Sequence, residues 1–315
     1  MSLPLIEPAD VIRPAGVVAE QILKLAQSSM RQAYRLWQQP DVLEQSPDDC
    51  QQEDLLHDFR VELRRLRVWV HQTRTLVRTR RQARMDLRCF AQGTNPSRDL
   101  EVILGLLESW HADREPRPEH PSPLIEPVLR RINQMEAKTE SLTLTGLAPR
   151  SRKGKHPAFG VWLSMQIGAQ HQMIRYMSQQ SDAELHQARI HVKHLRYLIE
   201  PLNKFTGTTE LINLLKQMQN RLGTLHDLAV LRMSIPGFVA EPLVAALEST
   251  LTSTSGRCSV ELKRIFAGQR DEVVDVIRWQ SDRYQETIKA WQRERDSLML
   301  ALESGLEALC HQLQA

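Results

Sequence analysis

Hydrophobic residues recur along most of the chain at the three- and four-residue spacing of amphipathic helices. Between residues 16 and 38 they include Val17, Ile22, Leu25, Met30 and Trp37, so this stretch is predicted to be one helix. The same spacing predicts further helices over about 51–89 (one or two helices), 96–110, 125–141, 160–179, 182–204, 208–222 and 227–234. No segment alternates in the way that predicts a strand.

Proline and glycine mark the expected breaks between these helices. Residues 1–15 contain three prolines and are expected to form an extended N-terminal segment. The segment GTNPS (93–97) is read as a break, with Pro96 in the first turn of the next helix. A proline-rich connector follows at 111–123, and another break is expected near Ser255–Gly256.

Two copies of a helical motif lie in the chain. LHDFRVELRRLRVWV (56–70) aligns without gaps on LHQARIHVKHLRYLI (185–199), and RDLEVI (98–103) aligns on HDLAVL (226–231) at nearly the same offset. Two matches in the same order indicate a duplication. We therefore predict an all-α protein with two pseudo-symmetric helical halves of about four helices each, at about 16–145 and 158–315.

Composition is that of an ordinary folded protein, with 25% charged and 41% hydrophobic residues. No apolar run is long enough for a transmembrane helix, and the N-terminus lacks a signal pattern. The four cysteines are scattered, which is typical of reduced thiols. We expect a cytoplasmic protein with no membrane partner.

Positive charge is concentrated on the repeated helices, although the net charge is only +3. Residues 57–88 contain ten arginines and three acidic residues. On a helix, five cations of the first copy fall within about 80° of one another: His57, Arg60, Arg64, Arg67 and His71. An apolar stripe lies about 90° round: Leu56, Phe59, Leu63, Leu66 and Val70. The second copy repeats both stripes, with His186, Arg189, Lys193 and Arg196 beside Leu185, Ala188, Val192, Leu195 and Ile199.

Like charges at these spacings repel one another, so their repetition favours contact with an external polyanion. The alternative is that the arginines pair with acidic residues such as Asp99 and Asp227. We expect these two aspartates to be structural instead, because each comes at the start of a predicted helix, where Asp caps free N–H groups.

The stretches HDFRVELRRLR (57–67), NPSRDLEV (95–102), ARIHVKHLRYLIE (188–200) and LGTLHDLAV (222–230) resemble the CHAD family, the conserved histidine α-helical domain. This resemblance implies two four-helix bundles around a basic central channel or cleft. It also implies binding of inorganic polyphosphate, often with location at polyphosphate granules.

Carried over residue by residue, the resemblance implies a polyphosphate-binding set of His57, Arg60, Arg64, Arg67, Arg98, His186, Arg189, Lys193, Arg196 and His226. Lys216 and Arg88, on the helices before the second motif, are secondary candidates. The first half departs from the family where GTNPSRD replaces the Leu-Gly turn that the second half keeps at Leu222-Gly223.

Other chemistry finds less support in the sequence. His191 and His194 flank Lys193, but the first copy has Glu62 and Arg65 there and no further ligand completes a metal site. We expect no metal and no cofactor. No catalytic motif appears, nor a strand-rich segment for the triphosphate-tunnel domain that often accompanies this family. We therefore expect a binding protein and not an enzyme. A nucleic-acid-binding protein and a polyphosphate-processing enzyme are the alternatives.

The basic loop SRKGKH (151–156) has two interpretations. It is either a flexible connector or an auxiliary clamp for the polyanion. The sequence favours the flexible connector, because no specific motif in the segment indicates a clamp.

Overall fold

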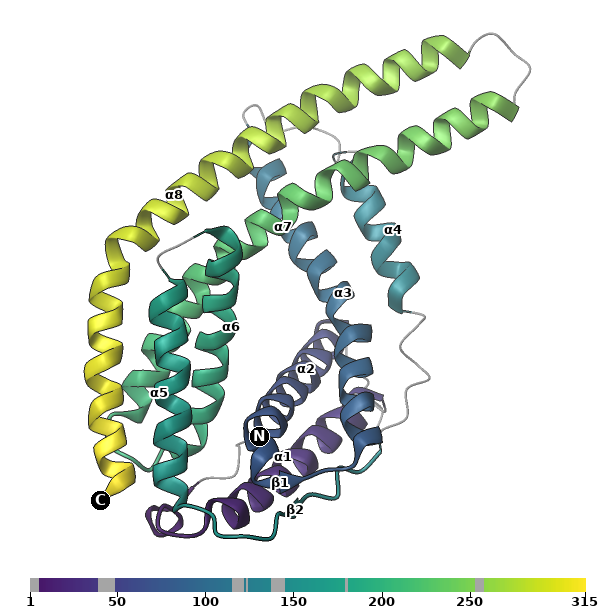
Figure 1. Cartoon of the computed structure of the whole chain (residues 1–315). Coiled ribbons are helices and arrows are strands. Elements are labelled where there is room, and N and C mark those ends of the chain that lie inside the picture. Colours follow the sequence, from purple (N-terminus) through teal and green to yellow (C-terminus); the bar gives the residue numbers. More distant parts are fainter. Residues whose placement is uncertain are drawn as a thin grey trace. The chain divides into compact units, whose positions relative to one another are not determined.

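The computed structural model describes residues 6–38, 49–114, 122, 124–136, 145–178, 181–252 and 258–315. These residues form eight α-helices (Figure 1): α1 (Ala15–Gln38), α2 (Asp49–Gln72), α3 (Arg81–Ala112), α4 (Ile125–Glu136), α5 (Phe159–Met177), α6 (Asp182–Ile199), α7 (Thr208–Thr252) and α8 (Cys258–Gln314). Short 3-10 helices lie at η1 (Pro8–Asp10), η3 (Thr73–Thr75) and η4 (Glu200–Leu202). The all-α class is confirmed, whereas the pseudo-symmetric halves and the central channel stay predictions.

Two strands of two residues each form the sheet of the described chain. Strand β1 (Val77–Arg78) pairs antiparallel with β2 (Arg150–Ser151), with Val77 opposite Ser151. The prediction of no strand is wrong here, because two residues are too few to show an alternating pattern.

Two predicted helix breaks are also wrong. Helix α3 continues through GTNPS (93–97), and α7 continues through Leu222-Gly223 and on past Pro236. A proline removes one hydrogen bond from a helix without having to end it when packing supplies the missing stability. As a consequence Asp99 and Asp227 lie inside helices, so they do not cap the N-termini that we predicted for them.

Residue contacts divide the chain into two compact units. Unit 1 comprises Met1–Gly93, Leu142–Asn220 and Glu294–Ala315, and unit 2 comprises Thr94–Ser141 and Arg221–Arg293. The boundaries fall inside α3, α7 and α8, so each unit draws segments from both sequence halves.

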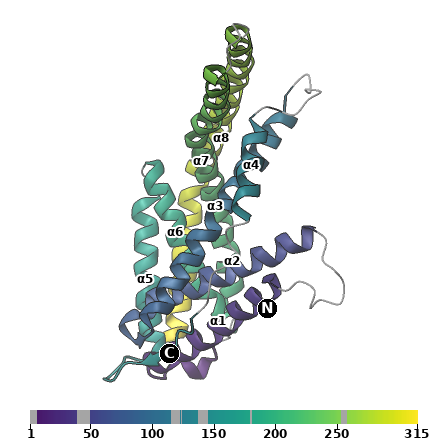
Figure 2. The same ribbon diagram turned by 90° about the vertical axis from the view of Figure 1, so that its right-hand side faces the viewer.

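Unit 1 contains two helix pairs, in which α1 lies against α2 and α5 lies against α6 (Figures 1 and 2). Aromatic rings fill the first pair: Trp37 stacks on Phe59 at a centroid distance of 5.3 Å, and Tyr34 meets Phe90 edge-on at 5.5 Å. The end of α8 packs closely on the start of α5, where the carbonyl oxygen of Leu313 lies beside Gly160.

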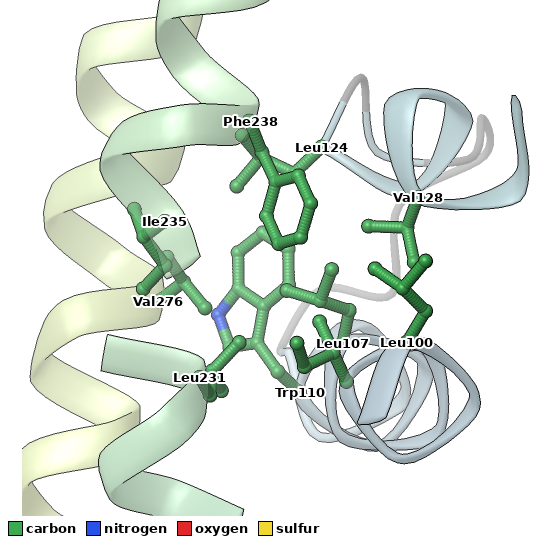
Figure 3. Close-up of a cluster of buried hydrophobic side chains, with 10 residues drawn as sticks. Leu100, Leu107, Trp110, Leu124, Val128, Leu231, Ile235, Phe238 and Val276 are labelled. Carbon is green, nitrogen blue, oxygen red and sulfur yellow. The ribbon is translucent and has the colours of Figure 1, made fainter. Parts of the chain in front are cut away.

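Unit 2 is built around one cluster of buried hydrophobic side chains from α3, α4, α7 and α8. Trp110, which is 1% exposed, lies among the others in Figure 3, between Phe238 and Leu231. Its indole nitrogen donates a hydrogen bond to Asp275 at 3.2 Å. Helices α7 and α8 run side by side here, and Gln280 on α8 donates a hydrogen bond to the carbonyl oxygen of Leu228 on α7.

Candidate anion-binding site

Helix α2 places the first predicted basic face at the edge of the unit 1 core. Its central apolar positions are buried as predicted: Phe59, Leu63 and Leu66. Because the basic and apolar stripes are neighbours, Arg60 is drawn into the core and is only 5% exposed. The other cations of this face are exposed or half-buried: His57, Arg64, Arg67 and His71.

Helix α6 repeats this arrangement. A capping box starts the helix: Ser181 accepts a hydrogen bond at the first turn, while the backbone N–H of Ser181 donates to Glu184 at 2.8 Å. The five predicted apolar positions are all buried: Leu185, Ala188, Val192, Leu195 and Ile199. The four predicted cations are all half-buried: His186, Arg189, Lys193 and Arg196.

The two repeated helices touch near their C-terminal ends. The indole nitrogen of Trp69 on α2 donates a hydrogen bond to the carbonyl oxygen of Tyr197 on α6 at 3.2 Å, with both groups buried. Arg65 on α2 also donates to Glu200, just after α6, at 2.9 Å. Both basic faces therefore belong to unit 1 and are held beside each other by a buried contact.

The charges of α2 act on the histidines of α6. Burial, together with the charges of His191, His71, Arg67 and Lys193, lowers the pKa of His194 to about 4. Burial likewise lowers the pKa of His186, with Arg189 and Lys193 adding to the effect. These imidazoles are neutral near pH 7, and an anion bound beside them would favour their protonated, donating form.

A cavity of about 780 Å³ lies at the C-terminal end of α2. Its polar lining consists of five arginines, one histidine and one threonine: Arg67, His71, Arg74, Thr75, Arg84, Arg88 and Arg152. Val70 and Leu87 complete the lining. No carboxylate is among the described residues that line this cavity, which we call the arginine cavity. The cavity brings together Arg67 from the predicted binding set and the secondary candidate Arg88.

The loop that carries Arg152 is held in place by hydrogen bonds. The backbone N–H of Arg152 donates to the carbonyl oxygen of Leu76 at 2.8 Å, and that of Ser151 donates to Glu20 at 2.6 Å. The imidazole of His156 contacts the carbonyl oxygen of Arg152 at 2.8 Å. The loop is therefore anchored to unit 1 at these points, and its role as a clamp for a polyanion stays a prediction.

Other predicted binding residues lie elsewhere. Arg196 packs over the ring of Tyr197, and its guanidinium lies 3.6 Å from the carboxylate of Glu200. Glu200, which also pairs with Arg65, therefore balances part of the charge of Arg196. Lys216 is exposed on the unit 1 part of α7. Arg98 and His226 belong to unit 2, where Arg98 pairs with Glu101 at 3.3 Å.

Sequence reasoning missed two arginines of the arginine cavity, Arg74 and Arg84, and considered Arg152 only as part of the 151–156 loop. Arg74 and Arg84 belong to the dense arginine stretch 57–88, but their positions follow the end of the repeated helix, so its helical angles say nothing about them. Arg152 is joined to them by the pairing of β1 with β2, which no local pattern predicts.

Two further properties concern the described part of the chain alone. Within it, no group of three or more His, Cys, Asp or Glu side chains is arranged to hold a metal ion. Across the same residues, no helix combines the length and apolar character needed to cross a bilayer.

Comparisons with known proteins identify the family of this chain. The family model of the CHAD domain matches residues 30–235. The crystal structure of the CHAD domain from the plant Ricinus communis is similar in fold, with a TM-score of 0.51 and 16% identity over 98% of this chain and 95% of that one. PptA from Streptomyces chartreusis shows a TM-score of 0.49 and 12% identity over 88% of this chain and 99% of that one. A comparison with curated protein sequences gave no match. Because the family model covers more than half of its length, the chain belongs to the CHAD family.

Proposed function

We propose that this protein binds inorganic polyphosphate along the basic faces of α2 and α6. The observation that carries the proposal is the contact between these helices. It places Arg67 and His71 of α2 close enough to His194 of α6 to lower its pKa, as the neighbouring Lys193 also does. Cations gathered at this contact attract an external anion, and condensed phosphate supplies many charges on one chain.

Several residues support the proposal with distinct roles. Arg67 and Arg64 offer planar guanidinium groups that bind phosphate oxygens in a bidentate way, whereas Lys193 offers a point charge. The neutral imidazoles of His186 and His194 would take up a proton as the polyanion approaches. Membership of the CHAD family, which is associated with polyphosphate-related proteins, points to the same ligand.

In this proposal the protein holds the polyanion and does not cleave it. Turnover of phosphoanhydrides in proteins usually uses divalent ions held by carboxylates. The arginine cavity offers cations in place of carboxylates. By holding polyphosphate, the protein would be brought to polyphosphate granules.

Filter binding with polyphosphate of graded length tests this proposal. Affinity should increase with chain length, because longer chains release more counterions. Excess duplex DNA or RNA should displace little polyphosphate, since few exposed aromatic rings accompany the basic faces to stack on bases. Displacement by equal amounts of nucleic acid would make nucleic acid the ligand. Release of orthophosphate in the presence of Mg²⁺ or Mn²⁺ would make the protein an enzyme.

A further inference from the structure

The described part of the chain shows no acid that balances the five arginines of the arginine cavity. Among the described residues, none of Arg67, Arg74, Arg84, Arg88 and Arg152 forms an ion pair with a carboxylate, although ion pairs occur elsewhere in unit 1. Burial lowers the pKa of Arg67, and the neighbouring charges of Arg88 in the cavity and Arg64 beside it act in the same direction. Burial and Arg74 lower the pKa of His71. Like charges gathered at one point repel one another, and a bound anion would relieve that repulsion.

The cations converge from separate segments of unit 1. Arg67 and His71 lie one turn apart on α2, and Arg84 and Arg88 lie one turn apart on α3. Residues four apart project from the same face of a helix. Arg74 on η3 and Arg152 after β2 complete the lining. Cations from four segments therefore surround one volume, whereas the α2 and α6 faces form rows along helices.

The position of Arg152 is fixed before any ligand arrives. Besides the hydrogen bonds of its loop, Gly16 on α1 leaves room for the loop, because a Cβ there would lie 2.4 Å from the Ser151 hydroxyl and 2.8 Å from the His156 ring. A preorganised site spends less binding free energy on ordering its side chains and loops.

The volume is large enough for a compact ligand together with its hydration water. Pockets for small ligands span roughly 300–1,000 Å³, and the arginine cavity falls in that range. Condensed phosphate is the anion class that offers several bidentate acceptors in so small a space. A triphosphate carries roughly as many negative charges as the cavity has arginines.

We propose that the arginine cavity is a pocket for a short condensed phosphate, a tri- or tetraphosphate, which is either a free oligophosphate or the end of a polyphosphate chain. The choice of condensed phosphate rests on the proposed function, but the pocket is distinct from the faces of α2 and α6. Arg84 and Arg152, which the repeat does not include, are its determining residues. Arg67 and His71 belong to both sites.

Calorimetric titration of the full chain with sodium tripolyphosphate tests the pocket. Wild type should bind tripolyphosphate more tightly than orthophosphate. The double variant Arg84→Gln/Arg152→Gln should bind it about tenfold more weakly or worse, because charge-assisted contacts to phosphate are lost. The matched control Arg130→Gln/Lys289→Gln removes two exposed cations from unit 2 and should bind like wild type.

A second variant keeps the test independent of the removed arginines. Thr75→Glu puts a carboxylate into the lining at an exposed position and removes no cation. It too should weaken tripolyphosphate binding. The pocket is overturned if either variant binds tripolyphosphate like wild type, or if wild type prefers orthophosphate. Wild type that binds tripolyphosphate but not long chains would support the pocket and contradict the proposed function.

Competition separates the two sources of the ligand. Long polyphosphate with free ends and the same polymer with chemically capped ends are each added to protein that holds labelled tripolyphosphate. Displacement by the free-ended polymer alone assigns the pocket to chain ends, and displacement by neither assigns it to a free oligophosphate. Equal displacement by both would overturn the proposal, because internal stretches of a long chain would then occupy the pocket.

Discussion

Trp69 on α2 donates a buried hydrogen bond to the carbonyl oxygen of Tyr197 on α6, 3.2 Å away. This bond joins the two helices that carry the repeated basic faces. Removal of the donor leaves a buried carbonyl oxygen without its partner, which is more costly than loss of an exposed hydrogen bond.

Trp69→Phe should therefore lower the free energy of unfolding by about 1–3 kcal/mol through the lost hydrogen bond and the reduced packing. Urea denaturation monitored by circular dichroism measures this change. Trp279→Phe is the control, since its indole nitrogen bonds to Asp113 in an exposed setting and should matter less. Equal losses of unfolding free energy in the two variants would show that the buried hydrogen bond between α2 and α6 stabilises the protein no more than the exposed one.

Gly160→Ala should destabilise unit 1 strongly. A Cβ at this position would lie 1.8 Å from the carbonyl oxygen of Leu313, and a backbone atom cannot turn away as a side chain does. Overpacking of this kind costs about 1–3 kcal/mol or more. Gly168→Ala on the same helix is the matched control, because nothing lies within 4 Å of its Cβ. That control should gain up to about 1 kcal/mol from the helix propensity of alanine, and thermal unfolding should separate the two variants clearly.

Much of unit 1 could be predicted from its sequence, because local periodicity determines which face of a helix is buried. The boundaries of α1 and the buried positions of α6 agree with the prediction. The burial of Arg60 follows from the same helical angles, since the two stripes adjoin. Two features were not predicted, because both depend on tertiary structure. Helix α3 continues through Pro96, and the pairing of β1 with β2 brings Arg152 into the same cavity as Arg67.

Stability should depend on pH through His194. Its pKa is about 4 in the folded protein against 6.5 in an ordinary setting, so the unfolded chain binds the proton first as pH falls. The stabilisation is complete above pH 6.5 and is lost as pH falls from there to about 4, by at most about 3 kcal/mol. His194→Gln should flatten this dependence in urea denaturation at a series of pH values. His311→Gln, at an exposed position near the C-terminus, should keep it, and an unchanged slope in His194→Gln would contradict the assignment.

Polyphosphate binding should be coupled to proton uptake for the same reason. The pKa values of His71, His186 and His194 are all lowered in the free protein, and a bound polyanion raises them. Affinity should therefore increase as pH falls from 7.5 to about 5.5, within the range over which histidines titrate. Calorimetry in buffers of different ionisation enthalpy would detect the protons taken up. Affinity that is independent of pH would place the histidines outside the site.

The salt dependence of polyphosphate affinity tests the central claim, that the facing cations of α2 and α6 bind the polyanion. The dissociation constant of long-chain polyphosphate is measured over a range of KCl concentrations for wild type, for Arg67→Gln/Lys193→Gln and for the control Arg130→Gln/Lys289→Gln. Each lost phosphate contact should reduce the slope of log affinity against log salt by about 0.7. The site variant should therefore bind more weakly with a slope smaller by about 1.4, and the control should match wild type. A site variant with the affinity and slope of wild type would contradict this account.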